Sequence, residues 1–195
     1  FVVQNSDLII SLGSRLDTHE VGSNASKFAP LAKKIIIDID ESELNKDNGM
    51  IADIKFYCDL KDFLEVINTK EIHTQDLEPW VKKISDWRGK YPACLPVYYG
   101  QEDNVNPYVL MEELSKKVEE DSIIIPDTGG TLTWAMQAFK VRSSQMLFSA
   151  FNHSPMGYAL PAAIGAQFAA PQRQVICIIG DGGMQMNIQE LETVA

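Results

Sequence analysis

Two segments of this chain share one design, in which a short apolar run leads into a glycine-rich acidic turn and then into a helical pattern. Residues 123–126 (IIIP) lead into DTGG at 127–130, and residues 175–179 (VICII) lead into GDGG at 180–183. An uninterrupted apolar run of this length is typical of a strand that is covered on both faces. Because strands that alternate with helices indicate parallel sheets, we expect an α/β fold built of three-layer domains.

The same alternation runs through the rest of the chain. Asp59 precedes an apolar stripe at helical spacing, and Asn106 followed by Pro107 is a typical helix start. Residues 69–105 contain three prolines and one helical stretch, which is typical of a connector between domains. The expected strands are 5–12, which should be buried, 34–40, 122–126, 146–151 and 174–179; the expected helices are 60–67, 78–87, 107–118, 132–139, 156–169 and one from 184.

Composition excludes several functional classes. Lys and Arg number 17 against 27 Asp and Glu, which gives a net charge of −10. General nucleic-acid binders and proteins that dock on anionic membranes need a positive surface. No apolar run approaches the roughly 20 residues of a membrane helix, and no signal peptide is visible. Cys58, Cys94 and Cys177 form no CxxC pair, so we expect reduced cysteines, a cytoplasmic location, and neither nucleic acid nor membrane as a partner.

The two ends of the chain do not resemble the ends of a domain. The chain begins at Phe1 without Met and stops at Ala195 inside a helical pattern with no cap. We therefore expect a piece of a longer protein; the alternative is that a disordered tail was left out.

The two glycine-rich turns predict a phosphate site. Glycine lets backbone N–H groups approach a ligand closely, and a helix N-terminus adds the positive end of its dipole. Asp181 lies inside one turn, and a carboxylate beside a diphosphate is accommodated when Mg²⁺ lies between them. No Walker GK[ST] sequence follows either turn. The alternative is a tight turn in which Asp181 only caps the next helix.

Three motifs occur in a fixed order: DTGG at 127–130, MGYALPAAIGA at 156–166 and GDGGMQMNIQEL at 180–191. Together they resemble the diphosphate-binding domain of thiamine-diphosphate enzymes, in the acetohydroxyacid (acetolactate) synthase-like branch. Residues 7–15 and 26–40 look like the second half of the central domain of that family. The resemblance implies three parts: 1–68 from the central domain, 69–105 as the connector, and 106–195 as the N-terminal part of the diphosphate-binding domain.

The resemblance also implies a role for each matching position. Asp181 would be a ligand of Mg²⁺, and Met156 would lie under the cofactor and hold its bent shape. The backbone carbonyl near Ser154 would accept a hydrogen bond from the aminopyrimidine. The alternative for Met156 is an ordinary core methionine. The remaining positions would bind the diphosphate: Gly129, Gly130, Thr131, Gly180, Gly182 and Gly183.

Other elements of the family pattern are missing from these residues. By the resemblance, the Glu that protonates the pyrimidine would belong to a domain ahead of Phe1 and would come from the partner subunit of a dimer, so no catalytic residue is assigned here. The resemblance likewise implies that the second side-chain ligand of Mg²⁺ would be an Asn beyond Ala195. Asn187 is too close to Asp181 for that job, and we interpret it as a helix-surface or packing residue. His153 is either a substrate contact or a hydrogen-bonded loop residue.

The implied enzyme is a homodimer or homotetramer that decarboxylates a 2-keto acid such as pyruvate and ligates the two-carbon unit to an acceptor. The piece alone is expected to be inactive. His19 replaces an Arg of the family's FAD-holding stretch, which argues against FAD. The alternatives are a simple decarboxylase or another carboligase of the family, a dehydrogenase with nicotinamide near Gly13 and Asp38, and a non-catalytic cofactor-binding module.

Overall fold

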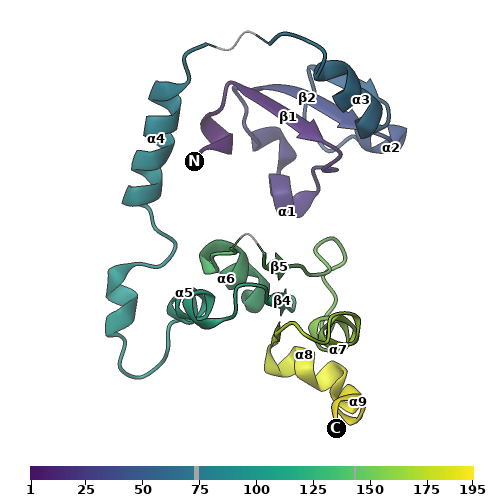
Figure 1. Ribbon diagram of the computed structural model, residues 1–195. Coiled ribbons are helices and arrows are strands. Elements are labelled where there is room, and N and C mark those ends of the chain that lie inside the picture. The colour runs from purple at the N-terminus through teal and green to yellow at the C-terminus, as the bar shows by residue number, and fades with distance from the viewer. Residues whose placement is uncertain (73–74, 143) are drawn as a thin grey trace. The chain divides into compact units, whose positions relative to one another are not determined.

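The computed structural model describes residues 1–72, 75–142 and 144–195. The chain divides into two compact units, Phe1–Tyr91 and Pro92–Ala195. Each unit contains a three-stranded parallel sheet (Figure 1), so the expected α/β class with parallel sheets is confirmed. The division falls inside the 69–105 segment, and the domain boundaries at 68 and 105 stay predictions.

Unit 1 has the strand order β1-β2-β3. Its strands are β1 (Leu8–Leu12), β2 (Lys33–Asp38) and β3 (Ile54–Tyr57), and Ile35 of β2 lies opposite Ile10 and Ile54. Short turns of helix join them, and one long helix follows. The helices are η1 (Val3–Asn5), α1 (Thr18–Val21), η2 (Ala25–Lys27), α2 (Glu41–Leu44), α3 (Leu60–Ile67) and α4 (Glu78–Lys90).

The main buried cluster of unit 1 lies on one face of this sheet. Ile36 of β2 packs there with Leu16, Val21, Ala25 and Leu44 from the connecting segments. The expectation of a buried first strand is wrong for this chain: alternate side chains of β1 are open, with exposed fractions of 46% for Leu8, 51% for Ile10 and 42% for Leu12. The reason is topological, because β1 is an edge strand.

Unit 2 has the strand order β5-β4-β6, with all three strands parallel. The strands are β4 (Ile123–Pro126), β5 (Met146–Leu147) and β6 (Val175–Ile178). The helices are η3 (Pro96–Gly100), α5 (Pro107–Lys117), α6 (Gly130–Ala138), α7 (Ala159–Ala169), α8 (Asp181–Met186), η4 (Ile188–Glu190) and α9 (Leu191–Val194).

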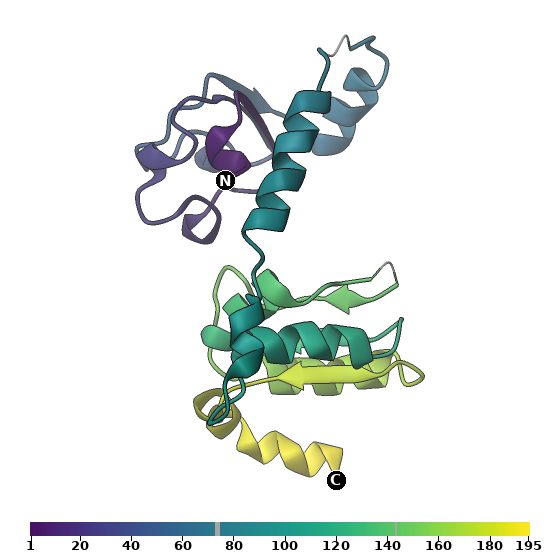
Figure 2. The same cartoon turned by 90° about the vertical axis from the view of Figure 1, so that its left-hand side faces the viewer.

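Unit 2 is a three-layer sandwich around β4. Alternation along the strand sends Ile124 toward Met111 of α5 and Ala135 of α6, and sends Ile123 and Ile125 toward α7. Figures 1 and 2 show α5 and α6 on one face of the sheet and α7 on the other. All four residues of β4 are buried, as the apolar run predicts for a central strand.

Several local expectations are confirmed. The Asp59 carboxylate accepts from Lys61 N (2.7 Å) at the start of α3, and the Asn106 side chain accepts from Tyr108 N (3.0 Å) at the start of α5. Two expectations are wrong: β5 spans two residues rather than 146–151, and the last helix begins at Asp181 rather than 184. Strand β3 was not expected. It has only four residues, one of them a lysine, and all four are exposed in the structure. In the described parts of the chain, no helix has the length and apolarity to span a bilayer.

Candidate functional site

The two glycine-rich turns lie at the same edge of the sheet in unit 2. β4 and β6 are neighbours in parallel register, with Ile125 opposite Cys177 and Pro126 opposite Ile178. The turns that follow, 127–130 and 180–183, therefore leave the sheet side by side at its carboxyl edge. This is where ligands bind in open parallel sheets.

Asp127, the first residue after β4, has a buried side chain that is hydrogen-bonded through both oxygens. It is 2% exposed, and its carboxylate accepts hydrogen bonds from Gly157 N and Ala159 N, each at 3.0 Å. The carboxylate thereby joins the end of β4 to the loop ahead of α7. Sequence reasoning gave this residue no role, although an acidic residue directly after a buried apolar run was a usable signal.

Asn187 forms a hydrogen bond with Gly157 from the opposite side. The Asn187 amide donates to Gly157 O (2.8 Å), and Gly157 has a φ of +88°. A Cβ added at Gly157 would lie 2.6 Å from Asn187 Nδ2 and 3.0 Å from Gly183 O. Glycine is thus required here for conformation and for space. Asn187 is a half-buried residue packed against Gly157, in keeping with its interpretation as a helix-surface or packing residue, and the structure adds a specific hydrogen bond to that role.

Helix α8 packs closely on this loop through its glycines. A Cβ at Gly183 would come within 2.2 Å of Asp127 Oδ2, and a Cβ at Gly182 would come within 3.0 Å of Met156 Cε. Met156 itself is 52% exposed, with its thioether end against the first turn of α8. The structure thus brings together the predicted site residues Met156, Gly182 and Gly183.

The start of α6 offers backbone groups rather than a side chain. Gly129 precedes the helix with a φ of +80°, and no side chain caps this end among the residues described. The Thr131 hydroxyl donates back to Asp127 O (2.8 Å) and Thr128 O (3.0 Å). An anion would therefore meet this turn through main-chain N–H groups, which point outward at a helix N-terminus. Gly130 makes room for Trp134, whose ring would lie 2.6 Å from a Cβ at that position.

Asp181 stands at the other helix start. It is exposed, its Oδ1 accepts from Gly182 N (2.8 Å), and Gly180 before it has open space where a Cβ would lie. Within the described ranges, no three His, Cys, Asp or Glu side chains form a metal-binding group. A single carboxylate fits Mg²⁺ when phosphate oxygens and water complete the shell, because Mg²⁺ is usually bound in this way.

The loop between β5 and α7 carries the remaining predicted residues. Ser154 has a φ of +43°, and its N–H donates to Ala150 O (2.7 Å). Its hydroxyl shares a hydrogen bond with the Thr128 hydroxyl, which ties this loop to the first glycine-rich turn. The Ser149 hydroxyl donates to Pro126 O (2.7 Å) and holds the loop to the end of β4. His153 is exposed on this loop.

The buried Asp127 carboxylate contributes to the pKa of the Cys177 thiol in β6. Burial and the negative charge of Asp127 raise the pKa of the Cys177 thiol to about 11. The thiol is therefore protonated at neutral pH, so its nucleophilicity is low. All three cysteines are free, as the sequence predicted.

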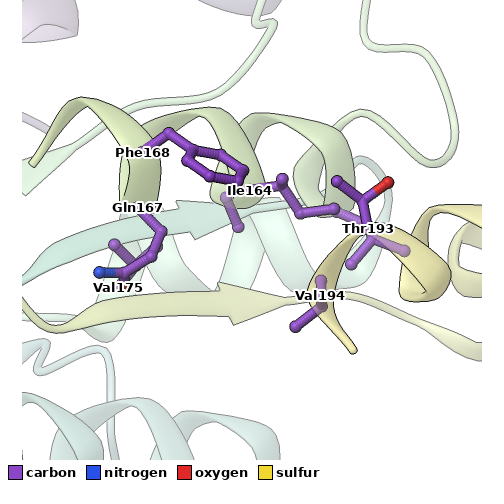
Figure 3. A pocket seen from close by; sticks show the side chains of 8 residues that line it. Ile164, Gln167, Phe168, Val175, Thr193 and Val194 are labelled. Carbon is purple, nitrogen blue, oxygen red and sulfur yellow. The ribbon is translucent and has the colours of Figure 1, made fainter. Parts of the chain in front are cut away.

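Unit 2 also has an apolar groove that is separate from these turns (Figure 3). It has a volume of about 330 Å³. Ile164 and Phe168 of α7, Val175 of β6, and Thr193 and Val194 of α9 line it, and none of the predicted site residues does.

A polar pocket of unit 1, also of about 330 Å³, lies by the segment that resembles the family's FAD-holding stretch. Its basic side chains are already paired: Arg15 Nε lies 2.8 Å from Glu43, and Lys46 Nζ lies 2.9 Å from the other oxygen of the same carboxylate. Glu43 thus neutralises part of the charge that an anionic cofactor would need there.

Comparison with known proteins matches both units. The family described as "Thiamine pyrophosphate enzyme, central domain" matches residues 1–67, and "Thiamine pyrophosphate enzyme, C-terminal TPP binding domain" matches residues 127–195. The acetolactate synthase large subunit of Cyanidium caldarium is 35% identical over 201 residues, covering 100% of this chain and 33% of that protein. Acetolactate synthase isozyme 1 large subunit of Escherichia coli K12 is 32% identical over 195 residues, covering 100% of this chain and 34% of that protein.

The chain spans about a third of the length of the curated relatives it matches. The two family descriptions name the same group of enzymes, fall one on each unit, and together take in more than half of the residues. The chain therefore belongs to the thiamine pyrophosphate enzyme family, with acetolactate synthase large subunits among its relatives.

Proposed function

We propose that these residues form part of the cofactor site of an acetolactate synthase-like enzyme. Such an enzyme decarboxylates a 2-keto acid, with pyruvate as the proposed substrate, and ligates the two-carbon unit to an acceptor. The observation that carries the proposal is the pairing of two glycine-rich turns at one sheet edge, with Asp181 exposed within the second turn and Met156 against α8. The family match over residues 127–195 supports thiamine diphosphate as the guest.

The proposed cofactor contacts follow from the local geometry. Main-chain N–H groups of Gly129, Gly130 and Thr131 would bind one end of the diphosphate, and those of the second turn would bind the other. Asp181 would hold Mg²⁺ against the phosphate oxygens, which neutralises their charge. When bound, thiamine diphosphate supplies the nucleophilic carbon and the electron sink for loss of carbon dioxide.

The chain's own residues would orient the cofactor. Met156 would support its bent shape from below, and the carbonyl near Ser154 would accept a hydrogen bond from the aminopyrimidine. The proton-transferring Glu is not assigned to these residues, so we expect residues 1–195 assayed alone to be inactive.

Assembly, location and further cofactors belong to the same proposal. We propose a homodimer or homotetramer in the cytoplasm, in keeping with a site that is completed by a partner subunit. FAD is not part of the proposal, because Arg15 and Lys46 are paired with Glu43.

The test is calorimetric titration of thiamine diphosphate, with and without Mg²⁺, into the protein that contains these residues. Asp181→Ala should weaken Mg²⁺-dependent cofactor binding by at least about tenfold, because a ligand of the ion is lost. Asp121→Ala is the matched control, since Asp121 is an exposed aspartate beyond the opposite end of β4 and should bind like the wild type. Equal cofactor affinity for wild type and Asp181→Ala would contradict the proposed metal site.

A further inference from the structure

We infer that Asp127 and Asn187 are positioning residues, which hold the backbone at Gly157 from two sides and thereby set the place of Met156. The inference rests on the proposed function, because Met156 matters only if a cofactor lies on it. It concerns two side chains that are neither among the expected diphosphate-binding residues nor the expected metal ligand.

The Asp127 side chain bonds this loop through both of its carboxylate oxygens. Both carboxylate oxygens are occupied, by Gly157 N and Ala159 N at 3.0 Å each, and the side chain is buried. Hydrogen bonds between a carboxylate and backbone N–H groups are charge-assisted and therefore stronger than neutral ones. Loss of this acceptor would leave two buried donors without partners, which is costly.

Asn187 holds the same loop from a different element. It follows α8 directly, and its Nδ2 donates to Gly157 O at 2.8 Å. The two hydrogen bonds act on the two peptide units that flank the Gly157 Cα, one from the β4 side and one from the α8 side. The close approach of Gly157 to Gly183 O leaves little room for the loop to shift toward α8.

The position of Met156 depends on these hydrogen bonds at Gly157, because its own side chain is poorly packed. A side chain that is 52% exposed is not held in place by burial, and a methionine has three flexible torsions. Its neighbour Gly157 is buried and bonded on both sides. The backbone at Gly157 is thus the part of the structure that keeps the Met156 thioether against Gly182.

The experiment compares Asp127→Asn and Asn187→Ala with Ser122→Ala in the protein that contains these residues. Asn at 127 keeps the shape but replaces one acceptor oxygen with a donor. Ser122 is a buried polar residue next to the opposite end of β4, bonded to Glu119 O and Gln174, so its loss tests general destabilisation. The readouts are hydrogen exchange at residues 157–159 without cofactor and titration of thiamine diphosphate with Mg²⁺.

Both site variants should exchange amide hydrogen at 157–159 about tenfold faster and should bind the cofactor about tenfold more weakly. Ser122→Ala should change neither property. A double-mutant cycle separates positioning from mere stability: in a Met156→Ala background, Asp127→Asn should have little further effect on cofactor affinity. Additive effects in that cycle would overturn the inference.

The outcomes distinguish the two proposals. If the wild type fails to bind thiamine diphosphate, the proposed function fails, while the exchange data still decide whether Asp127 and Asn187 hold the loop. If the wild type binds and the two variants bind equally tightly, the inference fails and the proposed function stands. Should Asp127→Asn not fold, Asn187→Ala removes a single partly buried hydrogen bond and decides the question by itself.

Discussion

Replacement of Gly183 by alanine tests the packing of the two glycine-rich turns directly. The added Cβ would lie 2.2 Å from Asp127 Oδ2 and 3.0 Å from Ile179 Cγ1. Real Cβ contacts are essentially never shorter than 3.0 Å, so either α8 or the carboxylate must move by nearly an ångström. Asp127 cannot retreat without stretching its bonds to Gly157 N and Ala159 N.

The expected cost follows from these two effects. Overpacking of a core contact and weakening of charge-assisted hydrogen bonds together should lower the stability of unit 2 by about 3 kcal/mol. The matched control is Gly165→Ala, since Gly165 lies inside α7 and a Cβ there meets nothing within 4 Å. Alanine in an open helix interior should raise stability by about 0.5–1 kcal/mol.

The assay is hydrogen exchange of the β4 amides over a range of urea concentrations, which reports the unfolding free energy of unit 2 alone. The two alanine variants should deviate from the wild type in opposite directions. A Gly183→Ala protein within about 0.5 kcal/mol of the wild type would refute the reasoning, since such a value is typical of ordinary surface substitutions.

Two further predictions concern a helix cap and a thiol. Asn106→Ala should lower the stability of unit 2 by about 1 kcal/mol, because the cap to Tyr108 N is lost, whereas Asn104→Ala on the exposed loop ahead of it should be neutral in the same urea series. The pKa of Cys177, raised to about 11, lies above its usual value near 9, so the folded state keeps a proton that the unfolded state loses. Stability should therefore fall as the pH rises from 9 to 11, and Cys177→Ser should flatten this slope; an unchanged slope would exclude Cys177 as the cause.

Much of the local structure follows from short-range patterns. The runs at 123–126 and 175–178 form strands because they are rich in β-branched residues, which suit a central, buried position in β4 and a half-buried edge position in β6. The caps at Asp59 and Asn106 hold because an Asx side chain reaches the second backbone N–H of a helix whatever its surroundings. These are the parts where neighbours in sequence decide the outcome.

Sequence patterns failed where distant residues decide. Strand β3 forms because it pairs with the free edge of β2. The residues of β3 are all exposed, so burial gives no pattern by which the sequence could predict the strand. β5 is short because only Met146 and Leu147 of the expected strand 146–151 pair with β4 before the chain continues toward α7.

The sequence by itself determined the α/β class, the position of both glycine-rich turns and the family resemblance, because each depends on residues close together in the chain. Only the tertiary structure decided what holds those turns together. Asp127 and Asn187 are 60 positions apart and meet at Gly157, and hydrogen bonds between such distant residues have no periodicity that a sequence can show. The need for glycine at position 183 is likewise a tertiary effect, since the atom that excludes a side chain there belongs to the distant Asp127.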